Sequence, residues 1–345
     1  MNRVAIAYAL ASAALFGAST PLAKLLVGEM SPLVLAGLLY LGSGIGLMAW
    51  RMVRSPGGTK LPKQDLPWLA GAIAAGGVAG PALLMYGLAR TDAANASLLL
   101  NLEAVLTACL AWIVFKENVD RRVFLGMAAI VAGGIVLSWS EAPRAAGLAG
   151  PALIAAACLA WSIDNNLTRR VSGGDAVTIA GLKGLIAGSV NMCLGLLNAG
   201  TLPAPGVTAL AGAVGLVGYG ISLVLFVMAL RHLGTARTGA YFSVAPFFGA
   251  AIALIFLGET ASPAFWLAAV LMAAGVWLHL SERHQHQHVH EEMTHTHEHL
   301  HDEHHRHEHP SGWDGREPHR HEHRHGGLRH SHPHYPDLHH RHGHH

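Results

Sequence analysis

The chain has 345 residues, of which 52% are hydrophobic and only 13% are charged, with a mean hydropathy of +0.36 and a formal net charge of +2. Soluble globular proteins carry about 25% charged residues, and 24 of the 26 histidines here follow Glu282, which leaves a body of low polarity and a polar tail. This composition excludes a soluble enzyme, a disordered protein and a disulfide scaffold, and it indicates a multi-pass membrane protein with a soluble appendage.

Ten apolar runs follow one another along the body, and each is close to the 20 or so residues that a bilayer-crossing helix needs. They cover approximately residues 4–25, 32–51, 67–88, 94–115, 122–140, 147–168, 176–197, 207–230, 236–257 and 263–281. The first run starts like a signal peptide, but it continues to Val27, which favours a spanning helix over a cleaved segment.

The basic residues of the loops predict the orientation of these runs. If the N-terminus is cytoplasmic, the inner side holds 13 Lys and Arg residues and the outer loops hold two, Arg90 and Arg144. This asymmetry agrees with the positive-inside rule. We therefore expect a protein of the bacterial inner membrane with both termini in the cytoplasm, and no nucleic-acid partner.

The body also repeats itself. At an offset of 142 residues Glu117 falls on Glu259 and Gly133 on Gly275, and near an offset of 145 Phe16 falls on Trp161. Each half then holds five runs, so the second half enters the membrane from the opposite side, as in the inverted repeats of many secondary transporters. We expect units at 1–141, 142–283 and 284–345; a duplication without a transport role is the alternative.

Several segments together are similar to a known family. They are LFGASTPLAKLL in the first run, IVFKE with FLGMAAIVAGGIVL, and APFFGAAIALIFLGE with AAVLMAAGVWL. Over about residues 4–281 the chain resembles the drug/metabolite transporter (DMT) superfamily, in its EamA branch. The resemblance implies an all-α membrane fold of ten transmembrane helices in two inverted five-helix repeats. It also implies gradient-driven movement of small metabolites, usually efflux. One position departs from the family: Ala104 aligns with Pro246, beside an unexpected Glu103.

Glu103 lies near the middle of the fourth run, where a charged group costs about 3 kcal/mol on insertion scales and normally faces the bundle interior. A carboxyl group there suits a proton acceptor that loads on one side of the membrane and releases on the other. Asn101 and Thr107 extend a small polar patch around it. The alternative is a protonated side chain that only bonds a neighbouring helix.

The sixth run contains the polar sequence AWSIDNNLTRR, in which Trp161, Asp164 and Thr168 share one helix face and Asn165 and Asn166 widen it. If this face lines a cavity, Asp164 would attract a cation or amine and Trp161 would stack on a substrate. The alternative is a helix end solvated by lipid headgroups, because Arg169 follows closely.

Two lysines lie within runs. Lys24 and Lys183 either extend toward the membrane surface or pair with Asp164 or Glu103. We assign Glu117 and Glu259, which recur in both halves, together with Pro21 and Pro246, to structural or gating positions. The three cysteines lie in apolar surroundings and are expected to be small buried hydrophobic residues; they are Cys109, Cys158 and Cys193.

After Glu282 the chain alternates histidine with other residues, a composition typical of weak, exchangeable binding of Zn, Ni, Co or Cu. The first candidate ligands are His284, His286, His288, His290, His295, His297, His299 and His301. We expect this tail to be disordered without metal. A low-complexity expansion without chemistry and a pH-responsive cationic tail are the alternatives.

The sequence therefore predicts a secondary active transporter that exports a small organic metabolite or drug-like compound by proton-coupled alternating access. It needs no cofactor, and its partners are the substrate and the lipid bilayer. Divalent metal efflux, or a transporter that responds to metal through its tail, is the main alternative. A lipid-modifying membrane enzyme is the least favoured, because the runs hold no nucleophile paired with a base.

Overall fold

The computed structural model describes residues 3–54, 62–115, 121–140, 148–171, 175–199, 201–233 and 235–280, and four short segments of the tail. By its contacts the chain divides into a helical body that ends at Glu282 and a smaller unit, Arg283–Pro336. We describe the two units separately.

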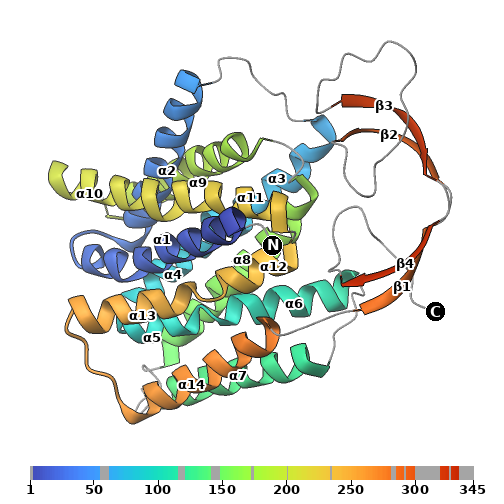
Figure 1. Ribbon diagram of the computed structural model, residues 1–345. Coiled ribbons are helices and arrows are strands. Elements are labelled where there is room, and N and C mark those ends of the chain that lie inside the picture. Colours follow the sequence, from blue (N-terminus) through green and yellow to red (C-terminus); the bar gives the residue numbers. More distant parts are fainter. Residues whose placement is uncertain are drawn as a thin grey trace. The chain divides into compact units, whose positions relative to one another are not determined.

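The first half of the body is helical in each apolar run (Figure 1). Its elements are α1 (Arg3–Val27), α2 (Pro32–Arg54), the short 3-10 helix η1 (Lys63–Asp65), α3 (Leu66–Ala72), the π-helix η2 (Ile73–Ala79), α4 (Gly80–Leu88), α5 (Ala93–Leu99), α6 (Leu102–Phe115) and α7 (Arg121–Ser140).

The second half repeats this order. Its elements are α8 (Ala149–Val171), α9 (Ala176–Ala199), α10 (Pro205–Gly215), the π-helix η4 (Leu216–Ile221), α11 (Ser222–Leu233), α12 (Thr235–Phe242), α13 (Ala245–Phe256) and α14 (Pro263–Leu280). A π-helix interrupts the third run of each half, and a break divides the fourth run of each half. The structure thus carries the internal repeat in its irregular segments as well as in its helices.

Six helical stretches among the described residues are long and apolar enough to cross a membrane, and three shorter apolar helices accompany them. The helix α8 is 23 residues long but ends in the polar sequence that contains Asp164. These helices confirm a multi-pass membrane protein.

The fourth and ninth runs, each predicted as one helix, are each two helices. In the ninth run Pro246 begins α13, because proline lacks the N–H that a continuous helix would need there. In the fourth run there is no proline, and the break falls at Leu100 and Asn101, where the Asn101 amide donates to Leu98 O at 3.0 Å. A side chain that bonds nearby backbone competes with the helix, and periodicity alone does not show this.

The two halves interlock. The first helix of each half packs mainly on the other half: α1 contacts α11 and α13, and α8 contacts α4 and α6. The pairs α2 with α9 and α7 with α14 also join the halves. Small residues allow these close approaches, as membrane helices require: a Cβ at Gly76 would overlap Asp164, and one at Gly218 would overlap Ser19. These two contacts are equivalent under the repeat.

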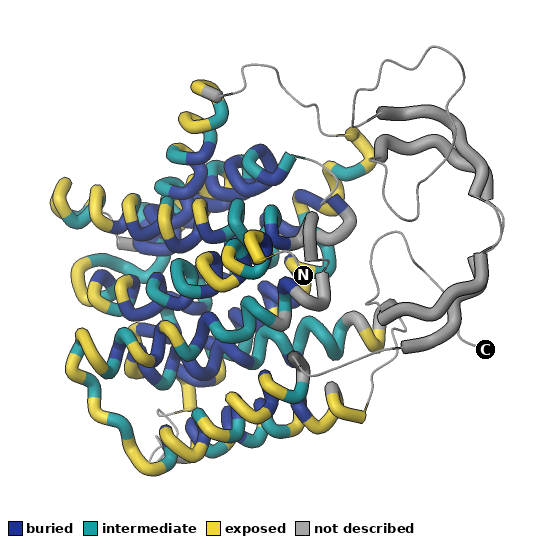
Figure 2. The backbone as a smooth tube through the Cα atoms, in the orientation of Figure 1, coloured by how far each residue is buried: buried dark blue, intermediate teal, exposed yellow. Residues whose placement is uncertain are grey.

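The bundle carries many exposed apolar side chains. Figure 2 shows exposed residues in yellow along its helices. Exposed tryptophans lie near helix ends, where aromatic belts meet the membrane interface; they are Trp50, Trp68, Trp112, Trp139, Trp266 and Trp277. The prediction of three buried cysteines is correct for Cys158 only, since Cys109 is half-buried and Cys193 is exposed. Apolar neighbours cannot distinguish a lipid-facing position from a core position.

The described parts of the tail are four strands, β1 (Gln285–His290), β2 (Met293–His299), β3 (His319–His325) and β4 (Leu328–Pro333). They form two antiparallel pairs, β1 with β4 and β2 with β3. The structure differs here from the expectation of a tail without regular structure. The alternation of His with other residues has the two-residue period of a strand.

Candidate functional site

The polar residues of α8 lie against the first half of the body, where they meet η2 and α6. Asp164 and Lys183, which lies on α9, form a buried ion pair: Lys183 Nζ donates to Asp164 Oδ1 and Oδ2 at 2.6 Å each. Thr168 also donates to Asp164 Oδ1, at 2.7 Å. Lys183 therefore pairs rather than extending to the membrane surface. Asp164 therefore has a counter-charge in this conformation.

Glu103 lies in the first turn of α6, directly after the break in the fourth run. Asn165 Nδ2 donates to Glu103 Oε1 at 2.8 Å, and Ser162 Oγ donates to the Glu103 carbonyl at 3.1 Å. Glu103 is half-buried and Asn165 is exposed. The side-chain partner of Glu103 is a neutral amide, which leaves its charge without the direct compensation that Asp164 receives.

Aromatic side chains pack around both π-helices. Trp161 Nε1 and Tyr40 Oη both donate to Gly76 O, in η2, at 2.9 Å. A π-helix shifts its backbone bonds and frees carbonyls for such side-chain donors. The ring of Phe16 packs on Trp161 and on Tyr219 of η4, at centroid distances of 6.1 and 5.7 Å. Trp161 is thus buried and bonded, not free to stack on a substrate in this conformation.

The opposite end of the bundle carries two further charged residues. Lys24 Nζ donates to Leu88 O at 2.6 Å and to Thr91 O at 2.8 Å, which places a cation at the C-terminal end of α4. Glu259 accepts the amides of Ala93 and Ala94 at 2.8 Å each, which places an anion at the N-terminus of α5. Glu259 thus caps α5, and Lys24 caps α4 instead of pairing with Asp164 or Glu103.

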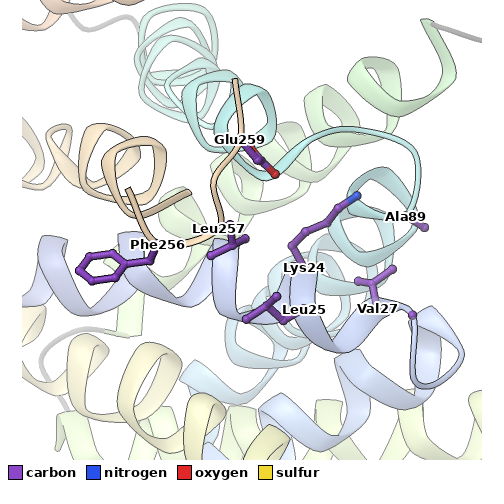
Figure 3. A pocket seen from close by; sticks show the side chains of 8 residues that line it. Lys24, Leu25, Val27, Ala89, Phe256, Leu257 and Glu259 are labelled. Carbon is purple, nitrogen blue, oxygen red and sulfur yellow. The ribbon is translucent and has the colours of Figure 1, made fainter. Parts of the chain in front are cut away.

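Lys24 and Glu259 also line a cavity of about 670 Å³, whose other walls are mainly apolar (Figure 3). The remaining lining residues are Leu25, Val27, Gly28, Ala89, Phe256 and Leu257. This cavity was not predicted, because its walls come from three separate parts of the chain.

The remaining predicted site residues differ in burial, and some lie outside the described residues. Asn101 is buried, Thr107 is half-buried with a buried hydroxyl, and Asn166 donates to Ser162 O at 2.8 Å. Pro21 is buried in α1. Glu117, His284 and His301 lie outside the described residues, and the other candidate histidines of the tail lie on β1 and β2.

Sequence reasoning also missed a contact between two serines of the two halves. Ser12 of α1 and Ser222 of α11 exchange bonds, since each hydroxyl donates to the other residue's carbonyl, at 2.7 and 2.9 Å. Serines bond their own helix equally well, so no sequence signal marked them. Among the described residues there is no group of three or more His, Cys, Asp or Glu side chains that could hold a metal ion.

Comparisons with known proteins agree with this architecture. The profile of the EamA-like transporter family matches the chain twice, over residues 3–139 and 148–281. A protein of Methanothermobacter thermautotrophicus, described as an uncharacterized transporter, is 28% identical over 281 residues, which cover 76% of this chain and 82% of that protein.

A second relative is shorter. A probable 4-amino-4-deoxy-L-arabinose-phosphoundecaprenol flippase subunit ArnE of Pseudomonas aeruginosa is 33% identical over 111 residues, which cover 32% of this chain and 94% of that protein. A solved crystal structure matches with a TM-score of 0.63 and 19% identity, covering 80% of this chain and 98% of the other. That likeness supports the fold.

Proposed function

The chain belongs to the EamA-like transporter family, and from this premise we propose that it exports a small organic metabolite or drug-like compound by proton-coupled alternating access. Family membership makes it a membrane transporter rather than an enzyme. The proposal includes ten crossings of the bacterial cytoplasmic membrane, with both termini in the cytoplasm. The interlocked halves support it, because two similar units of opposite orientation can exchange conformations around one site.

The bond between Glu103 and Asn165 is the observation that carries this proposal. It joins α6 of the first half to α8 of the second half at a broken helix, and broken helices near the midplane form the substrate and ion sites of many secondary transporters. A carboxyl group at that interface has different partners when the halves move apart. It can therefore take up a proton in one conformation and release it in the other.

The two halves differ in charge at this site, which leaves Glu103 as the coupling group. Under the repeat Glu103 falls on Ala245 and Asp164 falls on Ser19, so neither carboxylate has an acidic counterpart. Lys183 compensates Asp164 directly at 2.6 Å, whereas the side-chain partner of Glu103 is an amide. We assign Asp164 and Lys183 to positioning α8 against α9, and Glu103 to proton transfer.

The test is efflux from proteoliposomes loaded with a mixture of amino acids and amphiphilic amines, measured by mass spectrometry with and without a proton gradient. We expect the gradient to accelerate loss of at least one component. Glu103→Gln should abolish the acceleration, Glu103→Asp should keep part of it, and Glu29→Gln, an exposed carboxylate at a helix end, should keep it all. Gradient-dependent efflux that survives in Glu103→Gln would refute the role of Glu103.

We also propose that the tail binds divalent metal ions and adjusts transport to their concentration. Its strand register supports this: His286 faces His332 and His288 faces His330 in one pair, and His297 faces His321 in the other. Imidazole is the commonest metal ligand. Deleting residues 284–345 should remove metal binding and any metal dependence of efflux, while metal-free efflux persists.

A further inference from the structure

The cavity beside Lys24 and Glu259 has no part in the transport proposal, although it combines two charges with an apolar wall. Figure 3 shows Lys24, from α1, and Glu259, from the segment after α13, with their charged ends on the same side of the cavity. The ring of Phe256 points away from them. The cavity is therefore polar on one side and apolar on the other.

Both charged groups can form a further hydrogen bond. The ammonium group of Lys24 has three N–H donors, and its bonds to Leu88 O and Thr91 O use two of them. The carboxylate of Glu259 offers about four lone-pair sites, and its bonds to the amides of Ala93 and Ala94 use two. A ligand with one anionic and one cationic group would complement both residues.

The apolar side of the cavity reaches the outer surface of the bundle. Leu25 is 59% exposed and Phe256 is 78% exposed, on helices that end at Val27 and Phe256. Exposed apolar side chains on a membrane-spanning bundle contact acyl chains, and the ends of its helices lie at the depth of the lipid headgroups. The polar side of the cavity thus lies at headgroup depth and its apolar rim borders the acyl region.

We propose that this cavity binds the headgroup of a phospholipid that carries a primary ammonium group, such as phosphatidylethanolamine. The phosphate binds the free N–H of Lys24, the ammonium group donates to Glu259, and the acyl chains lie along Leu25 and Phe256. The bound lipid then joins α1 of the first half to the segment that follows α13 of the second half, at the end of the bundle where Glu259 caps α5.

Native mass spectrometry of the full chain in detergent, titrated with single lipids, tests this site. We expect phosphatidylethanolamine to bind about tenfold more tightly than phosphatidylcholine, whose nitrogen has no N–H, or phosphatidylglycerol, which has no cation. Glu259→Gln should remove the preference for the primary ammonium group. Arg90→Gln is the matched control, because Arg90 is a neighbouring exposed cation that does not line the cavity.

A second variant fills the cavity without changing its charges. Gly28 lines it, and a Cβ built there meets no heavy atom within 4 Å, so Gly28→Phe should fold and occlude the site. We expect it to lose the preference for phosphatidylethanolamine. Equal binding of the three lipids by the wild type, or an unchanged preference in Gly28→Phe, would overturn the proposal. Displacement of the lipid by equimolar soluble glycerophosphoethanolamine would also overturn it, by showing that the acyl chains contribute nothing.

Discussion

Removing one partner of the ion pair between Asp164 and Lys183 should be one of the most destabilising single substitutions in the second half. Both side chains are about nine-tenths buried, and Lys183 Nζ lies 2.6 Å from both carboxylate oxygens. Removing one partner of such a pair leaves a buried charge without compensation, which costs about 3–5 kcal/mol. We therefore expect Lys183→Met, which keeps the length of the side chain, to lower the free energy of unfolding by about that amount.

The measurement is a double-mutant cycle. The free energy of unfolding of each variant is measured in lipid bicelles by steric trapping. Asp164→Asn combined with Lys183→Met should recover about half of the loss or more, because no unpaired charge remains. Arg51→Gln is the matched control. Its ion pair with Asp175 is longer, at 3.6 Å, and more exposed, and pairs of that kind contribute about 1 kcal/mol or less.

Two results would refute this reasoning. If Lys183→Met cost no more than Arg51→Gln, burial of the pair would not govern its strength. If the effects of Asp164→Asn and Lys183→Met simply added in the double variant, the two side chains would not interact directly.

Three other outcomes follow from the same structure. Glu259→Gln should weaken the N-terminal cap of α5 by about 1–2 kcal/mol, seen as faster hydrogen exchange of the Ala93 amide; an unchanged exchange rate would contradict the cap. Gly76→Ala should destabilise the body by about 1–3 kcal/mol through overlap with Asp164, whereas Gly239→Ala, with open space around it, should not, as thermal unfolding in detergent would show. Deleting residues 284–345 should abolish nickel binding in equilibrium dialysis, and retained binding would place the ligands in the body.

Hydrophobic runs and the internal repeat predicted much of the body correctly, because a bilayer imposes length and apolarity on every crossing helix. They did not predict the irregular segments. The π-helix η2 has a freed carbonyl at Gly76 that is bonded by side chains of other helices, Tyr40 and Trp161. The break at Asn101 involves a bond from its own side chain to Leu98 O. Neither kind of bond appears in hydrophobic periodicity.

The sequence predicted which polar residues lie near one another in the candidate site, but not which of them form ion pairs and hydrogen bonds. Helical spacing placed Asp164 and Thr168 on one face, and the structure joins them by a hydrogen bond. Spacing within one helix could not decide whether Lys183 pairs with Asp164 or with Glu103, since that choice depends on how α9 lies against α8. For the same reason Lys24 had two expected positions, and its capping of α4 was neither of them.

The opposite orientation of the two halves is the central claim, and it can be measured directly. Gln64, before α3, and Leu202, before α10, are exposed residues at equivalent connections of the two halves. In a chain whose native cysteines are replaced by alanine, Gln64→Cys and Leu202→Cys would be treated in turn with an impermeant maleimide on intact cells. We predict labelling of Leu202→Cys in intact cells and of Gln64→Cys only after permeabilisation. Labelling of both from the same side would contradict the inverted repeat.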